Sequence, residues 1–286
     1  MSRVREAVVE QKKAVIIWDR WYADHRIVIH FVLNIFRQAI QTDSAVRQLP
    51  NAETLLAQGR TIIESTNDWK QGKTFYKVVK TYSAPKAPGE PAGWYCRVSE
   101  HTPEDATFDE FWEKLGVNKG ENEVHYVDVV KKATLVKQIS PSQAIWSMYY
   151  RFPAPLSPRV FTVLQTIGLS ESTPRTGIIV SIPVDLSSDP ELAKLEEKGV
   201  KARYVSIESL KELDGGKVEW RMATASRAEG NLPQFLTERS MPSSISHDVP
   251  GLLKWLHSLR PKGEASTEPA SGAVAAEAHA TTVTAK

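Results

Sequence analysis

The pattern of apolar and polar positions divides the chain into a helical beginning, a strand-rich middle and a helical end. Residues 4–41 contain no proline or glycine, and polar residues recur at steps of four and three from Arg26 to Gln41. Apolar residues such as Ile27 and Phe31 occupy the other faces. This spacing is typical of a helix with one polar stripe, and it predicts an added N-terminal helix before the main fold.

Short apolar runs between turn residues follow, and they predict strands. The runs lie at residues 61–65, 73–82, 94–99, 133–139, 144–150, 160–167, 177–184, 200–210 and 217–227. One short helix is expected at 107–115, followed by a polar turn at 118–123. Asp214, Gly215 and Gly216 have the residue types of a hairpin turn between the last two strands. Many short strands with little helix between them predict an antiparallel sheet.

The last apolar run, residues 233–259, has helical spacing. Pro242 and Pro250 interrupt it. Because a proline inside a helix removes a hydrogen bond and clashes with the preceding turn, we expect a kink or two consecutive helices, with Asp248 as a cap.

Beyond the last helix the chain consists mainly of Ala, Glu, Ser and Thr, a composition that cannot bury a core. We therefore expect three parts. Residues 1–50 form a helical region packed on the main domain, residues 51–260 form the main domain, and residues 261–286 form a disordered tail.

Composition sets limits on the partners and the compartment. A net charge of +2 and a hydrophobic content of 41% are ordinary for a globular protein and argue against nucleic acid as a partner. The single cysteine, Cys96, cannot form an internal disulfide, which favours a reducing compartment. The longest strongly apolar stretch, residues 27–36, has about half the length of a bilayer span. We expect a cytoplasmic protein, with peripheral membrane contact as a further expectation.

The common sequence motifs of nucleotide binding, serine hydrolysis and zinc binding are absent from the chain. His25 and His30 are five residues apart on the predicted helix, which places them on different faces. We therefore expect no metal site and no cofactor.

Residues 152–158 contain Pro153, Pro155 and Pro158 between two predicted strands. Proline fixes its own φ and biases the preceding residue toward extended geometry. The segment is therefore expected to be a rigid extended connector that forms part of a cavity wall.

Four segments carry a resemblance to a known family: WYCRVSEH (94–101), PLSPRVF (155–161), VSIPVD (180–185) and EWRMATAS (219–226). With the Gly-Asn-Leu-Pro turn at 230–233 and a last helix, they resemble the START domain, the steroidogenic-acute-regulatory-related lipid-transfer fold, and most closely a fungal START-like family of unknown function. The resemblance implies an α+β fold of the START-like helix-grip type, a curved antiparallel β-sheet with a long C-terminal helix. It also implies intracellular binding of an apolar ligand, without an established activity.

Alternation with period two gives each predicted strand two faces. In residues 217–227 we assign the face of Trp220, Met222 and Thr224 to the concave side of the sheet. The candidate ligand-binding residues are Arg97, Trp146, Met148, Tyr150, Arg159, Trp220, Met222 and Thr224. For Trp146, as for Trp220 and Met222, core packing is the alternative. For Arg159, which matches the arginine of the START Ser-x-Arg-x-Phe run, the alternative is a structural clamp.

Arg97, Ser99, Glu100 and His101 form the densest cluster of polar side chains at a strand end. A guanidinium and an imidazole there can orient or protonate the polar end of a ligand, so Arg97 and His101 are the candidate catalytic residues if the protein is an enzyme. Alternatively, both pair with acidic neighbours such as Glu104 and serve the fold. A buried Arg97 needs a carboxylate or a ligand as its partner.

Three hypotheses about function follow. The first is binding, and intracellular transfer, of an apolar small molecule such as a lipid, a sterol or a polyketide-like compound, with transient membrane contact. The second is a cyclase or isomerase of fungal secondary metabolism on the same scaffold, without metal or cofactor. The third is an interaction module that binds no ligand.

Overall fold

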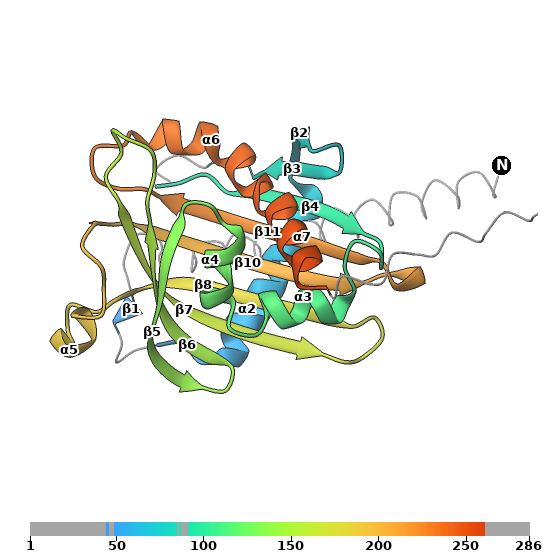
Figure 1. Cartoon of the computed structure of the whole chain (residues 1–286), viewed down its shortest axis with the longest axis horizontal. Coiled ribbons are helices and arrows are strands. Elements are labelled where there is room, and N and C mark those ends of the chain that lie inside the picture. The colour runs from blue at the N-terminus through green and yellow to red at the C-terminus, as the bar shows by residue number, and fades with distance from the viewer. Residues whose placement is uncertain (1–43, 46–48, 85, 87–90, 261–286) are drawn as a thin grey trace, which may run out of the picture.

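A computed structural model describes residues 44–45, 49–84, 86 and 91–260 (Figure 1). The predicted N-terminal helix and the predicted disordered tail lie outside these residues. In the described part of the chain, nine strands form one curved sheet in the order β2-β3-β4-β11-β10-β8-β7-β6-β5, and all neighbours in this order are antiparallel. Two short strands pair in parallel with this sheet, β1 with β8 and β9 with β7.

The strands are β1 (Ser44–Ala45), β2 (Lys70–Phe75), β3 (Val79–Ser83), β4 (Tyr95–His101), β5 (Val130–Ser140), β6 (Gln143–Tyr150), β7 (Arg159–Ser170), β8 (Thr176–Asp185), β9 (Val200–Lys201), β10 (Arg203–Glu212) and β11 (Val218–Arg227). The α-helices are α2 (Ala52–Ser65), α3 (Phe108–Leu115), α4 (Lys119–Tyr126), α5 (Pro190–Ala193), α6 (Gln234–Ser246) and α7 (Asp248–Leu259). Two short 3-10 helices, η2 (Thr66–Asp68) and η3 (Asp214–Gly216), complete the list. The predicted α+β helix-grip fold is confirmed.

The two faces of the sheet are covered by different helices. Helix α2 packs on one face, where Leu55 and Ile62 join a buried cluster with Cys96 and Val98 of β4. Helices α3 and α7 cover the opposite face, which carries Trp220. The alternation predicted for β4 and β11 therefore separates an α2 side from a concave side.

Helix α2 corrects the strand predicted at 61–65, which is its last turn. The Asn51 side chain accepts a hydrogen bond from the backbone N–H of Thr54 at 2.8 Å and so caps the first turn. Leu55, Gly59 and Ile62 recur at helical spacing and are buried. The β-branched residues at 61–63 favoured a strand locally, but burial of this face stabilises the helix.

Two other local predictions were wrong. The single strand expected at 73–82 is the hairpin of β2 and β3, because Tyr76 and Lys77 adopt positive φ values of 48° and 65° and turn the chain. The polar turn expected at 118–123 is the beginning of helix α4. Its side chains Lys119 and Glu123, one helical turn apart, are both buried.

The C-terminal element is two consecutive helices, as predicted, and they cross the concave face diagonally (Figure 1). Pro250 lies in the first turn of α7, where a missing N–H costs little, whereas Pro242 lies inside α6. The prediction that Asp248 caps α7 was wrong. Asp248 is the first residue of the helix, after His247, and its carboxylate lies near Arg97 instead. None of the described helices has both the length and the apolarity to cross a bilayer.

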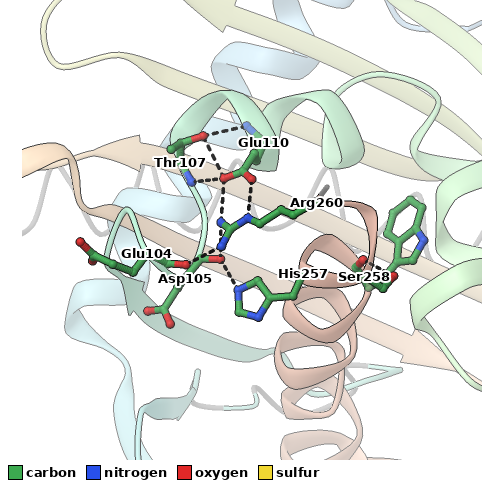
Figure 2. A network of polar contacts seen from close by, with 8 residues as sticks. Glu104, Asp105, Thr107, Glu110, His257, Ser258 and Arg260 are labelled. Carbon is green, nitrogen blue, oxygen red and sulfur yellow. Dashed lines mark hydrogen bonds and ion pairs between the residues drawn. The ribbon is translucent and has the colours of Figure 1, made fainter. Parts of the chain in front are cut away.

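The end of α7 is fixed to the start of α3 by the Arg260 network, which comprises Arg260, Glu110, Glu104, Asp105 and His257 (Figure 2). Arg260 binds both carboxylate oxygens of Glu110, with Nε–Oε1 and Nη2–Oε2 distances of 2.9 and 3.0 Å. It also donates to the carbonyl oxygens of Glu104 and Asp105. The network holds one end of α7 in place.

We expect Arg260→Ala to lower the free energy of unfolding by about 1 kcal/mol at neutral pH, since the pair is partly exposed. Hydrogen bonds from Arg260 lower the pKa of Glu110 from 4.5 to about 2. A carboxyl with a depressed pKa stabilises the fold above its unfolded pKa and loses this effect as the pH falls. The difference between wild type and variant should shrink from pH 4.5 downward in thermal unfolding. A constant difference at all pH values would contradict the assignment.

Candidate functional site

A cavity of about 350 Å³ lies between the concave face of the sheet and helices α4 and α6. Its wall combines apolar and aromatic side chains with a small group of charged ones. Tyr150, Phe161 and Tyr204 form one continuous aromatic wall, with ring centroids 4.9 Å apart for Tyr150–Phe161 and 5.3 Å apart for Phe161–Tyr204. Met222 of β11 and Ile245 of α6 also line the cavity.

The proline-rich connector at 152–158 contributes Phe152 and Leu156 to the cavity lining, as expected for a cavity wall. It is not the extended connector that was predicted, because it forms a turn in which the N–H of Leu156 donates to the carbonyl oxygen of Pro153 at 3.1 Å. Arg159 follows it and is 3% exposed. Its Nε donates to the carbonyl oxygen of Ala228 at 3.3 Å, and its Nη1 donates to the carbonyl oxygen of Ser157. These bonds fasten the connector to the end of β11, so Arg159 has the contacts of a clamp and also borders the cavity.

A buried ionic cluster, formed by Arg97, Lys119, Glu123, Glu208 and Asp248, lies at one part of the wall. The Nζ atom of Lys119 lies 2.9 Å from Glu123 Oε1 and 2.8 Å from Glu208 Oε1. The members come from β4, α4, β10 and α7, so folding alone brings them together.

The environment shifts the pKa values of the cluster in different directions. Burial alone would lower the pKa of Lys119, but the carboxylates of Glu123 and Glu208 raise it well above its ordinary value. Burial raises the pKa of Asp248 to about 7, although the charge of Arg97 opposes this shift. Lys119 is therefore held as a cation, whereas Asp248 titrates near neutral pH.

Arg97 has an unusual environment. It is fully buried, and its guanidinium carbon lies 3.8 Å from the centre of the Trp220 ring. Its nearest carboxylate oxygens, on Glu208 and Asp248, are 3.8 and 3.7 Å from Nη2, which is beyond hydrogen-bonding distance. Within the described residues, no group accepts a hydrogen bond from Nε, Nη1 or Nη2 of Arg97.

Five of the eight ligand-binding candidates line the cavity: Arg97, Tyr150, Arg159, Met222 and Thr224. The structure does not place the other three in the lining. Trp146 packs against Gly120 of α4, and Met148 belongs to a packed cluster with Phe161. Trp220 is covered by Arg97 and by Phe111, whose ring centroid is 5.7 Å away. For Trp146 and Trp220, the core-packing alternative describes the observed contacts. Met148, which was expected only as a ligand-binding residue, packs in the core as well.

His101, the other candidate catalytic residue, lies outside the cavity lining. It is 2% exposed, its Nε2 is 2.8 Å from Ser99 Oγ, and its ring packs on Phe111. Burial lowers its pKa to about 4. His101 is therefore neutral at physiological pH and packed in the core beside α3, away from the cavity. Cys96 packs in the core on the α2 side, and burial raises its pKa to about 12, which makes it a poor nucleophile.

Sequence reasoning missed Lys119, Glu123, Glu208 and the role of Asp248. One signal was present: Glu208 shares its strand face with the apolar side chains of Tyr204 and Leu210. A carboxylate at such a position needs a buried partner. The sequence could not supply that partner, because Lys119 lies almost ninety residues earlier in a polar segment.

The sheet, the C-terminal helices and the cavity between them define a START-like helix-grip fold. The fold is similar to three human START structures. These are StAR-related lipid transfer protein 5 (TM-score 0.58, 16% identity, 73% of this chain and 99% of that chain), STARD10 (0.60, 13%, 74% and 83%) and the StarD13 (DLC2) lipid transfer and protein localization domain (0.55, 14%, 73% and 98%).

The chain belongs to the DUF3074 family of proteins of unknown function, whose family model matches residues 94–256. Among curated protein sequences, none matches this chain. The match to the family begins at β4 and ends within α7, so it includes every member of the ionic cluster.

Proposed function

We propose that this protein binds one apolar small molecule in the cavity between the sheet and α6. The observation that carries the proposal is the cavity itself, bounded by the aromatic wall of Tyr150, Phe161 and Tyr204 and by the inner side of α6. Such concave, largely apolar sites with a few polar groups are typical of small-ligand binding. The names of the similar human structures, which refer to lipid transfer, support the same class of ligand.

The size of the cavity limits which ligands fit. About 350 Å³ is near the lower limit of small-molecule pockets. It suits a compact ring system or a single chain, such as a sterol-like or polyketide-like compound, better than a phospholipid with two long acyl chains. Each square ångström of apolar ligand surface that leaves water contributes about 25 cal/mol to binding.

Transfer between membranes is part of this proposal, and helix α6 supports it. Phe235 and Leu236 in its first turn are 65% and 42% exposed. Leu232, Thr237 and Met241, on and next to the same helix, line the cavity. An exposed apolar turn beside a cavity wall can contact a lipid surface while the ligand enters or leaves. This would be a transient, peripheral contact.

We expect Met222→Trp to reduce ligand binding at least about tenfold, because the larger side chain fills part of the cavity and leaves less room for the ligand. Met222→Leu conserves volume and is the matched control. Native mass spectrometry of freshly purified protein detects a bound molecule, and fluorescence titration with Nile red measures occupancy of the cavity. The proposal fails if Nile red binds wild type and Met222→Trp equally, or binds neither.

A further inference from the structure

The first observation is a set of unmet hydrogen-bond donors in the cavity wall. Arg97 is fully buried and lines the cavity, yet its three guanidinium nitrogen atoms make no hydrogen bond with the described residues. A guanidinium carries five N–H donors and no acceptor. A buried polar group without a partner is costly, so this position favours a ligand atom that accepts hydrogen bonds.

The second observation is an acceptor beside these donors. Asp248 Oδ2 lies 3.7 Å from Arg97 Nη2, and Asp248 also lines the cavity. Its side chain is 20% exposed. In the described part of the chain, the carboxylate of Asp248 pairs with Arg97 by charge alone, without a hydrogen bond. A small polar group that lies beside this pair can reach both side chains.

Two other members of the ionic cluster, Lys119 and Glu208, are already satisfied. Lys119 Nζ contacts Glu123, Glu208 and, at 3.2 Å, the hydroxyl of Tyr126. These three contacts occupy the three N–H donors of the Lys119 ammonium. The Oε2 atom of Glu208 accepts a hydrogen bond from Trp220 Nε1 at 3.0 Å. The Oε1 atom of Glu123 is taken by Lys119. Arg97 is therefore the cation with free donors, and Asp248 is the carboxylate nearest to them, so a ligand group is best placed at this pair.

The charges of the cluster decide which ligand end fits. Two cations, Arg97 and Lys119, face three carboxylates, Glu123, Glu208 and Asp248. A carboxylate or phosphate on the ligand would accept from Arg97 but would lie close to Asp248 and Glu208, where like charges repel in a low dielectric. An ammonium group would meet Arg97. An uncharged group that both donates and accepts avoids both conflicts.

We propose that Arg97 and Asp248 together anchor an alcohol group of the ligand. The hydroxyl oxygen accepts a hydrogen bond from Arg97, and the hydroxyl proton is donated to Asp248. This inference rests on the proposed function and names the class of ligand as a neutral, hydroxyl-bearing apolar molecule.

Matched single-chain probes test the anchor by displacement of Nile red, which is uncharged, at about pH 8.5. At this pH Asp248, with its pKa of about 7, is ionised. The probes are 1-dodecanol, its methyl ether, dodecanoate and dodecylammonium. We expect dodecanol to bind about tenfold more tightly than the ether, which accepts but cannot donate, and more tightly than either ion.

Asp248→Asn separates charge repulsion from shape. The amide oxygen still accepts the hydroxyl proton, but the negative charge is gone. Dodecanoate should therefore gain about tenfold in affinity, while the affinity for dodecanol changes by less than about threefold. Lys254→Ala, an exposed position on the same helix as Asp248 and outside the cavity lining, should leave the order of the four probes unchanged.

The outcomes distinguish the two proposals. If Nile red and the probes do not bind, or if Met222→Trp does not weaken their binding, the proposed function fails and the anchor fails with it. If Nile red binds but dodecanoate or the ether competes as well as dodecanol in wild type, binding stands and the alcohol anchor is overturned. The wild-type probe series decides this question even if Asp248→Asn does not fold.

Discussion

Replacing Lys119 with methionine is expected to lower the free energy of unfolding by about 3 to 5 kcal/mol, because it leaves buried carboxylates without a counter-ion. Glu208 and Glu123 are 2% and 8% exposed, and both lie within 3 Å of the Lys119 ammonium. The attraction of Lys119 keeps the pKa of Glu208 low despite its burial. Urea unfolding at neutral pH measures the loss.

The triple variant Lys119→Met, Glu123→Gln, Glu208→Gln is the control. It removes the charges together, and the amide of residue 208 can still accept from Trp220 Nε1. The charges of Arg97 and Asp248 remain and still face each other. Replacing a buried cation together with its carboxylate partners is often close to neutral, so most of the stability should return. A loss below about 1 kcal/mol for Lys119→Met alone would show that water reaches the cluster and screens it.

The strands were predicted well where alternation is strong. In β11, Val218 and Trp220 face the concave side while Ala223 and Ala225 pack toward α2, as the period of two requires. Elements whose stability comes from distant contacts were missed. The segment at the start of α4 is polar and contains Gly120. It becomes helical because Lys119 pairs with Glu208 of β10 and with Glu123 one turn along the same helix.

The candidate site was predicted only in part, again because the rest depends on contacts between residues far apart in the sequence. Alternation assigned Met222 and Thr224 to the face that lines the cavity, and the arginine in β4 was expected to need a partner. Trp146 shares a strand face with Tyr150, but only Tyr150 lines the cavity, because α4 covers Trp146. Period two gives the face of a strand. It cannot give the position of a helix above that face.

Gly251→Ala is expected to destabilise the protein by about 2 to 3 kcal/mol, although alanine is the better helix former by about 1 kcal/mol. Helix α7 packs against α4 at this glycine. A Cβ atom at residue 251 would lie 2.4 Å from the carbonyl oxygen of Tyr126. Because the contact is with backbone, a rotamer change cannot relieve it, and α7 has to move away from α4.

That movement should also weaken ligand binding, since Asp248 lies three residues before Gly251 on α7 and faces Arg97 of β4. Urea unfolding and Nile red titration of the same variant therefore test packing and site together. Lys254→Ala, an exposed position on the same helix, is the control and should alter neither measurement. If Gly251→Ala is as stable as wild type, α7 has room to shift. The close approach of α7 to α4 then does not hold the Arg97–Asp248 pair in place.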